Sequence, residues 1–235
     1  MKIVVIHGQN HKGSTYNMAK LLIDAIDCEK QVDEIFLPRD LNHFCIGCYN
    51  CVEDESKCPY YSEKNAIMKK VEQADLLIMT TPNYCMAPSG PMKSFIDLTF
   101  TYWMSHKPRK CMFSKRAVIL STTAGMGANQ AIKPVARALF YWGIPFVKSY
   151  GVAVQAKSWD EVAPKKKDKI TNHMSKIAKK LVSKYQKGKA PAVPLKTKFI
   201  FMMMSKMQKA GMGSGDIERE YWSKQGWLDG GKPWK

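Results

Sequence analysis

Continuous apolar segments of the chain alternate with segments in which apolar residues recur every three or four positions. Lys2–His7 is a β-branched run, the pattern of a strand buried on both faces of a parallel sheet. Similar apolar runs predict four further strands, at Val32–Leu37, Asp75–Thr81, Arg116–Ser121 and Phe146–Val154. Helical spacing predicts five helices, at Tyr16–Ile26, Ser62–Gln73, Pro91–Trp103, Gln130–Trp142 and Trp159–Tyr185. This alternation predicts an α/β fold with a doubly wound five-stranded parallel sheet and helices on both faces.

Several residues mark where the predicted helices begin. We expect Ser62 to act as the N-cap of its helix, since its hydroxyl can accept a hydrogen bond from the first turn. Pro91 and Pro134 are expected in first turns, where a missing N–H is tolerated.

The chain changes character after Gly188. It continues with a proline-rich linker, a methionine-rich stretch, a flexible glycine-rich segment and an aromatic stretch, at Ala190–Pro194, Phe199–Met207, Gly211–Gly215 and Tyr221–Trp227 respectively. We therefore divide the chain into a domain at 1–188 and a basic C-terminal extension at 189–235. The extension is too short to have a core of its own, so we expect its aromatic rings to pack on the main domain or on a second subunit.

Three loops follow predicted strands, at Gly8–Thr15, Pro82–Gly90 and Thr122–Ala128. Ligands of doubly wound sheets bind beyond the carboxyl ends of the strands, so the fold would bring these loops together. The first loop is small and polar and leads into a helix, whose free N–H groups and dipole favour an anion. Ser14 and Thr15 add hydroxyl groups, and His11 and Lys12 add positive charge. An ordinary turn with Ser14 as the N-cap is the alternative.

Composition and charge limit the classes of protein to consider. The chain has 235 residues and is 45% hydrophobic, which suits one domain with a sizeable core. Its net charge of +17 is uneven, with 19 Lys/Arg against 7 Asp/Glu after residue 150. This excess is a solvated lysine-rich surface, or it attracts an acidic partner, an anionic cofactor or a membrane surface. No nucleic-acid-binding motif is present, so nucleic acid is not an expected partner.

The N-terminus opens directly into a predicted strand, which is not the pattern of a signal peptide. No apolar run is long enough to span a membrane, so no transmembrane segment is expected. We therefore expect a cytoplasmic protein.

Four of the seven cysteines are clustered, at Cys45, Cys48, Cys51 and Cys58. Four thiolates at this spacing can surround an iron–sulfur cluster. The proline directly after Cys58 is similar to the proline that follows the last cysteine of ferredoxin-like motifs. They can also form a closed tetrahedral zinc site. A third alternative is that they are packing residues or free thiols. The other three cysteines, Cys28, Cys85 and Cys111, are isolated.

These motifs resemble those of the flavodoxin-fold NAD(P)H-dependent FMN reductase family, especially its iron–sulfur flavoprotein branch. Gly8-Gln-Asn-His-Lys-Gly-Ser-Thr15 is similar to the family's first loop, with His11 at the usual arginine and Ser14 at the usual asparagine. Thr81–Asp97 resembles the family's Pro-x-Tyr loop followed by Lys-x-Phe-x-Asp on a helix, in which Lys93 and Asp97 are structural. The resemblance covers about residues 1–185 and implies a flavodoxin-like sheet.

The resemblance implies noncovalently bound FMN. It places His11, Ser14 and Thr15 around the phosphate. The residues implied around the flavin ring are Pro82, Asn83, Tyr84, Cys85 and Met86, with contacts from Thr122, Thr123, Ala124, Gly125 and Gly127. The cysteine spacing matches that of the branch with a [4Fe–4S] cluster, which implies Cys45, Cys48, Cys51 and Cys58 as ligands.

The implied function is an FMN-dependent NAD(P)H oxidoreductase. It would pass electrons from the nicotinamide cofactor through FMN to a quinone, a flavin, an aromatic acceptor or a protein, with no catalytic acid–base pair. The alternative is an iron–sulfur flavoprotein that transfers electrons without a small-molecule substrate of its own. A flavodoxin-type carrier is disfavoured because such carriers are typically acidic, and a non-enzymatic flavin-binding protein is a third class. Relatives with this fold are often dimers, so a homodimer or higher homo-oligomer is expected.

Overall fold

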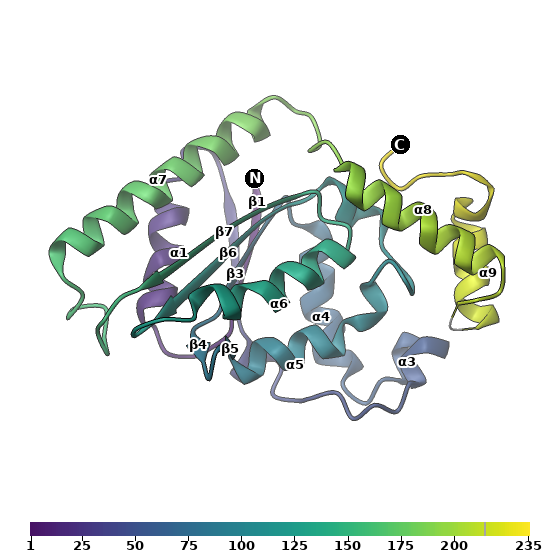
Figure 1. Cartoon of the computed structure of the whole chain (residues 1–235), viewed down its shortest axis with the longest axis horizontal. Helices are drawn as coiled ribbons and strands as arrows, with labels where there is room; N and C mark the ends of the chain where they lie inside the picture. The colour runs from purple at the N-terminus through teal and green to yellow at the C-terminus, as the bar shows by residue number, and fades with distance from the viewer. Residues whose placement is uncertain (214) are drawn as a thin grey trace.

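The computed structural model describes residues 1–213 and 215–235, and it is built on a five-stranded parallel sheet (Figure 1). Across the sheet the strands are ordered β2 (Gln31–Phe36), β1 (Lys2–His7), β3 (Leu76–Thr80), β6 (Arg116–Thr123) and β7 (Phe146–Ala153). The chain moves outward from β1 to one edge and then from β3 to the other, so the topological switch point lies between β1 and β3. This order is flavodoxin-like and confirms the predicted fold class.

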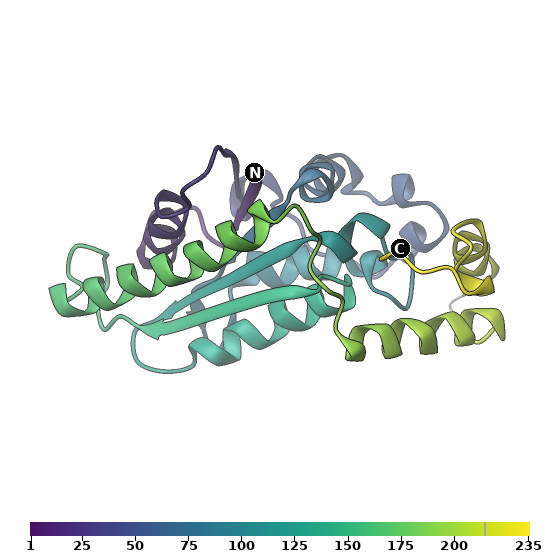
Figure 2. The same ribbon diagram turned by 90° about the horizontal axis from the view of Figure 1, so that it is seen from above.

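The central strands β1, β3 and β6 are buried on both faces of the sheet, which explains the continuous apolar run in β1. Ile3 and Val5 pack with α1 (Ser14–Asp24) and α7 (Pro164–Gln186) on one face. Val4 and Ile6 belong to the core on the other face, which is covered by α4 (Tyr61–Gln73), α5 (Gly90–Leu98) and α6 (Ala128–Tyr141). Figure 2 shows the two layers of helices from above.

The longest helix, α7, explains where much of the positive charge lies. Its apolar residues Ile170, Met174, Ala178 and Leu181 are buried against the sheet. Its lysines lie mostly on the remaining sides of the helix, facing solvent. Within the described ranges, the structure contains no helix long and apolar enough to cross a bilayer.

Two helices differ in length from the prediction because of local side-chain chemistry. α5 ends at Leu98 rather than Trp103, since Thr99 Oγ1 donates to the carbonyl of Phe95 (2.8 Å) and a 3₁₀ turn, η2 (Phe100–Tyr102), follows. α7 begins at Pro164 rather than Trp159. The proline forces the residue before it, Ala163, out of the helical region (φ −52°, ψ 135°).

One expected N-cap was wrong, and one proline lies deeper than expected. Ser62 lies inside α4, which begins at Tyr61. Ser14, the N-cap in the alternative interpretation of the first loop, is the first residue of α1. The cap position of α1 is Gly13. The side-chain amide of Asn17 donates a hydrogen bond to the carbonyl of Gly13, which ties the end of the loop to the first turn of the helix. α6 starts two residues earlier than predicted, so Pro134 lies in its interior.

Several segments between the predicted strands and helices contain short elements. These are α2 (Leu37–Asp40), α3 (Asn50–Glu53), η1 (Glu55–Lys57), η3 (Lys110–Ser114) and a hairpin of β4 (Asn83–Tyr84) with β5 (Ala87–Pro88). The loop expected to start at Thr122 begins two residues later, because Thr122 and Thr123 continue the pairing of β6 with β7. The cysteine segment is accordingly more ordered than an irregular loop, since it contains α3 and η1.

The C-terminal extension consists of α8 (Leu195–Lys209), α9 (Asp216–Lys224) and η4 (Trp227–Asp229). It lies at one end of the domain (Figure 2). The expected flexible segment Gly211–Gly215 includes Ser214, which lies outside the described residues. Aromatic residues of the extension enter a buried cluster with residues of the main domain, which comprises Met104, Phe113, Val193, Phe201, Trp222 and Trp227. The rings of the extension therefore pack on the main domain.

This packing predicts a large contrast between two phenylalanines of α8. Phe201 is buried among aromatic rings, whereas Phe199 is 59% exposed. Phe201→Ala should lower the free energy of unfolding by about 3–5 kcal/mol, and Phe199→Ala by less than about 0.5 kcal/mol, because only the first leaves a cavity. Urea unfolding followed by tryptophan fluorescence measures both. Equal effects would show that the extension is not docked as described.

Candidate functional site

The first two loops are tied together at the switch point. Ser89, just before α5, donates its hydroxyl proton to the carbonyl of Gly8 (2.8 Å), and its N–H donates to Thr81 Oγ1 (2.9 Å). All three residues are buried. A Cβ atom at Gly8 would lie 2.5 Å from Ser89 Oγ, so the approach requires glycine. The loop after β1 and the loop after β3 therefore leave the sheet in a fixed relation.

The second and third loops are also in contact. Asn83 Nδ2 donates to the carbonyl of Met126 (3.0 Å) and lies 3.3 Å from Thr123 Oγ1. Gly127 has φ +95°, and a Cβ there would lie 2.6 Å from Asn83 Nδ2 and from Met86 Sδ. The structure thus brings together the three loops that the sequence placed far apart.

The N-terminus of α1 is open to an anion. The residue at the cap position, Gly13, has no side chain that could cap the helix, and the first turn contains no acidic residue. Thr15 is buried and Ser14 is half-buried, both in that first turn, while His11 and Lys12 are exposed. The free N–H groups of the turn and the helix dipole favour an anion here, and Ser14 and Thr15 carry hydroxyls in the same turn.

The hairpin after β3 is backbone-strained at its tip. Cys85 (φ 49°) and Met86 (φ 61°) fill the two-residue turn between β4 and β5, positions that usually take Asn-Gly. Each left-handed residue without glycine costs about 1–2 kcal/mol. Tyr84 and Met86 are nonetheless partly exposed, and Asn83 Oδ1 is buried without a hydrogen-bond partner among the described residues. Retained strain, exposed apolar groups and an unsatisfied acceptor are typical of a ligand-contacting loop.

The remaining residues of the expected flavin site differ in how they are placed. Pro82 is buried at the start of the hairpin loop, and Thr122 is buried within the last part of β6. Thr123 Oγ1 donates to the carbonyl of Met126 (2.6 Å). Ala124 and Gly125 are exposed at the tip of the third loop. These last two offer their backbone to a ligand, whereas the side chain of Thr122 is enclosed.

His7 is a polar residue that the sequence did not single out, although it ends the apolar run of β1 beside the switch point. Its Nε2 lies 2.9 Å from Glu34 Oε2 and its Nδ1 lies 3.1 Å from Thr80 Oγ1. The ring stacks on Phe36, with 4.6 Å between centroids. Burial lowers the pKa of His7, and the hydrogen bond and charge of Glu34 oppose this in part. A neutral ring with its proton on Nε2 satisfies both neighbours.

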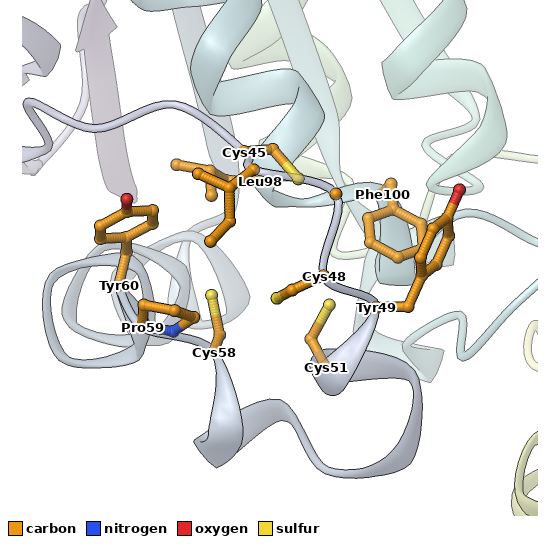
Figure 3. A pocket seen from close by; sticks show the side chains of 11 residues that line it. Cys45, Cys48, Tyr49, Cys51, Cys58, Pro59, Tyr60, Leu98 and Phe100 are labelled. Carbon is orange, nitrogen blue, oxygen red and sulfur yellow. The ribbon is translucent and has the colours of Figure 1, made fainter.

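The four clustered cysteines line one cavity, away from the three loops. Its volume is about 170 Å³, and its other walls include Tyr60, Leu98 and Phe100. Figure 3 shows the sulfur atoms of Cys48, Cys51 and Cys58 turned toward a common space, with Cys45 on the opposite side of it. Cys51 and Cys58 are buried, and Cys45 and Cys48 are exposed. The structure therefore gathers all four sulfurs around one mainly apolar space.

Positive charge lies close behind these thiols. Burial raises the pKa of Cys51, and the ammonium group of Lys64 acts in the opposite direction. Lys64 is itself buried on α4, the helix that follows Cys58. No set of three or more His, Cys, Asp or Glu side chains in the described chain is arranged as ligands of one metal ion.

The C-terminal extension braces the cysteine segment through residues 104–109. Lys107 Nζ donates to the carbonyl of Val52 at the end of α3 (2.6 Å), and Arg109 pairs with Glu55 of η1 (2.6 Å). From the other side, Trp222 Nε1 of α9 donates to the carbonyl of His106 (2.6 Å). The backbone around the cysteines is thus held by a segment that the extension holds in turn.

α5 connects the two parts of the site. It starts at Gly90, next to Ser89 of the second loop, and its last residue, Leu98, lines the cysteine cavity. A helix of nine residues is about 13 Å long. The cysteine cavity and the three loops are therefore separate sites at a fixed spacing within one chain.

The sequence profile of the NADPH-dependent FMN reductase family matches residues 1–158. An iron–sulfur flavoprotein of Archaeoglobus fulgidus is 28% identical over 193 residues, which cover 79% of this chain and 83% of that protein. A second iron–sulfur flavoprotein, from Methanocaldococcus jannaschii, is 33% identical over 101 residues, which cover 41% of this chain and 51% of that protein.

Among solved structures, an FMN-dependent NADH-azoreductase from Bacillus anthracis in complex with FMN matches with a TM-score of 0.59. The match covers 77% of this chain and 100% of that chain at 11% identity. At this level of identity the likeness shows a shared fold.

The lowered pKa of His7 predicts a pH-dependent stability. Below about pH 6.5 the unfolded chain takes up a proton that the folded chain resists, so stability is fully present above that pH and falls as the pH drops. The free energy of unfolding should therefore fall more steeply from about pH 7 to pH 5 in the wild type than in His7→Gln. Urea titrations across this range measure it. The exposed His11→Gln should follow the wild type, and parallel curves for His7→Gln would contradict the assignment.

Proposed function

Because the chain belongs to the NADPH-dependent FMN reductase family, we propose that it is a flavoenzyme that draws electrons from NAD(P)H through bound FMN. The observation that carries this proposal is the meeting of three loops at the β1–β3 switch point. That is where open α/β sheets bind their ligands. An oxidoreductase activity follows from the family, and the residues and the acceptor are our proposals.

The phosphate of FMN belongs at the first loop in this proposal. The uncapped first turn of α1 offers N–H groups, and Ser14 and Thr15 offer hydroxyls within the same turn. Lys12 adds positive charge at the exposed rim, and His11 adds ring nitrogens that can donate a hydrogen bond. A single short cradle suits the one terminal phosphate of FMN rather than the diphosphate of FAD.

The flavin ring belongs against the hairpin and the third loop. Tyr84 and Met86 present flat and flexible apolar surface, and Asn83 has a buried amide oxygen that lacks a donor. Ala124 and Gly125 are exposed beside them, Gly127 is half-buried against Asn83 and Met86, and Cys85 lies at the hairpin tip. Bound FMN would supply hydride acceptance and electron transfer, while these residues orient the ring and shield one side from water.

The acceptor is proposed only as a class. A quinone, a second flavin or an aromatic compound could stack on the partly exposed face formed by Tyr84 and Met86. A protein acceptor is the alternative, and it would agree with an electron-transfer role without a small-molecule substrate. Three predictions from the sequence stay predictions. They are a homodimer or higher homo-oligomer, a cytoplasmic location, and a boundary at residue 188 between the main domain and the C-terminal extension.

We further propose that Cys45, Cys48, Cys51 and Cys58 hold a [4Fe–4S] cluster. The fit rests on four sulfurs around one cavity of about 170 Å³ and on a buried ammonium group, Lys64, that lacks a partner among the described residues. A cluster would supply one-electron storage. α5 would hold it about 13 Å along the helix from the flavin loops, and the extension would brace its ligands.

FMN-dependent oxidation of NADH or NADPH tests the function. We expect turnover with FMN present and about 2–3 kcal/mol weaker FMN binding in Ser14→Ala/Thr15→Ala, because each hydroxyl is assigned to a charged phosphate. Excess FMN should restore turnover in this variant. Isothermal titration and steady-state assays with a quinone acceptor measure both, with exposed Ser62→Ala as the control. Unchanged FMN affinity in the double variant would overturn the phosphate assignment.

Iron analysis tests the cysteine assignment. Protein purified without air should contain iron and acid-labile sulfide in comparable amounts, and Cys51→Ser or Cys58→Ser should lose both because a cluster of this type uses four thiolates. Cys28→Ser, a cysteine outside the cavity, is the matched control. Iron-free wild-type protein from an iron-supplied anaerobic culture would contradict the cluster and leave the flavin assignment intact.

A further inference from the structure

Lys64 is an exception among the buried lysines of the described chain. Its side chain is 2% exposed, and its Nζ makes no hydrogen bond with any described residue. The other buried lysines have partners. Lys115 Nζ donates to the carbonyls of Glu72 and Ala74, and Lys107 Nζ donates to that of Val52. A specific reason is therefore needed for the position of Lys64.

An ammonium group in this position is costly unless negative charge accompanies it. Removing a charge from water without a partner costs several kcal/mol, even after local relaxation. No carboxylate of the described residues forms an ion pair with Lys64. Lys64 lies one turn of α4 beyond Tyr60, whose side chain lines the cysteine cavity, so the two residues share one side of the helix. An anionic centre in that cavity would compensate the ammonium group, whereas neutral thiols would not.

Position along the chain supports the same connection. Cys58 lines the cavity, Pro59 and Tyr60 continue its wall, and α4 starts at Tyr61. Lys64 lies in the first turns of that helix, on its buried side together with Ile67 and Met68. The lysine is thus carried into the core by the same segment that carries Cys58. Any movement of this segment moves ligand and charge together.

We propose that Lys64 is the built-in counter-charge of an anionic metal–thiolate centre in the cysteine cavity. The proposal rests on the cluster assigned above. A [4Fe–4S] core held by four thiolates is a net anion and becomes more negative on reduction. Lys64 therefore favours a loaded cavity over free thiols, and it favours the reduced cluster over the oxidised one.

The counter-charge should act with opposite sign in the empty and the loaded protein. Without metal, Lys64 is a buried charge with no partner, so removing the charge should stabilise the fold. With an anionic centre in place, the same change removes an attractive interaction and should weaken the hold on the metal. A lysine kept only for packing would not show this reversal.

The experiment compares Lys64→Met, Lys64→Arg and Lys69→Met with the wild type. Lys64→Met preserves the length of the side chain without the charge, and Lys64→Arg preserves the charge. Lys69→Met removes an exposed charge from the same helix and is the matched control. Each protein is reconstituted without air with ferrous iron and sulfide. The readouts are the melting temperature of the iron-free form, the rate of iron loss to a chelator and the midpoint potential of the cluster.

We expect iron-free Lys64→Met to melt above the iron-free wild type. Loaded Lys64→Met should release iron about tenfold faster or more and have a more negative midpoint potential. Lys64→Arg should retain wild-type release and potential, and Lys69→Met should match the wild type throughout. Lys64→Met with wild-type iron release and potential would overturn the counter-charge while leaving the cluster in place. A wild-type chain that binds FMN but neither iron nor Zn²⁺ would overturn both the cluster and the counter-charge, and leave the flavin assignment intact.

Discussion

The close approach of Ser89 to Gly8 is the contact on which the arrangement of the site depends. It joins the end of β1 to the start of α5 through a buried hydrogen bond of 2.8 Å that leaves no room for a Cβ atom at Gly8. The loop proposed to bind the phosphate begins on one side of this contact, and the strained hairpin lies on the other. α5 starts directly after Ser89 and ends at Leu98, which lines the cysteine cavity, so the position of the cavity also depends on this contact. One glycine and one hydroxyl thus set the positions of both parts of the site.

The sheet and its helices follow from the sequence because burial on two faces requires continuous apolar strands. All four residues from Ile3 to Ile6 are buried, alternately in the core on one face and in the core on the other. A strand of a parallel sheet covered on both faces is the local structure that buries every residue of such a run. The ends of the helices were less predictable. A hydroxyl bond by Thr99 and the restriction imposed by Pro164 decided where α5 and α7 end and begin, and each acts through contacts that periodicity does not register.

The candidate site could likewise be predicted from the sequence only in part. The sequence could indicate the loops and the four cysteines, because glycine, hydroxyl and thiol spacing carry their chemistry locally. It could not indicate His7 or Lys64, since each is a single polar residue in an apolar pattern and its role depends on neighbours far along the chain. Nor could it indicate that α9 supports the cysteine segment, because that support passes through hydrogen bonds between residues more than a hundred positions apart.

α5 has a consequence for how such a protein can vary over evolution. Adding or deleting one residue in a helix rotates everything beyond it by about 100° and shifts it by about 1.5 Å. Because tunnelling rates fall exponentially with distance, a change in the length of α5 would alter exchange of electrons between a flavin and a cluster. The segment 41–44, which precedes the first of the four cysteines, carries no such constraint. Related chains should therefore vary in the length of this segment while keeping the nine residues of α5.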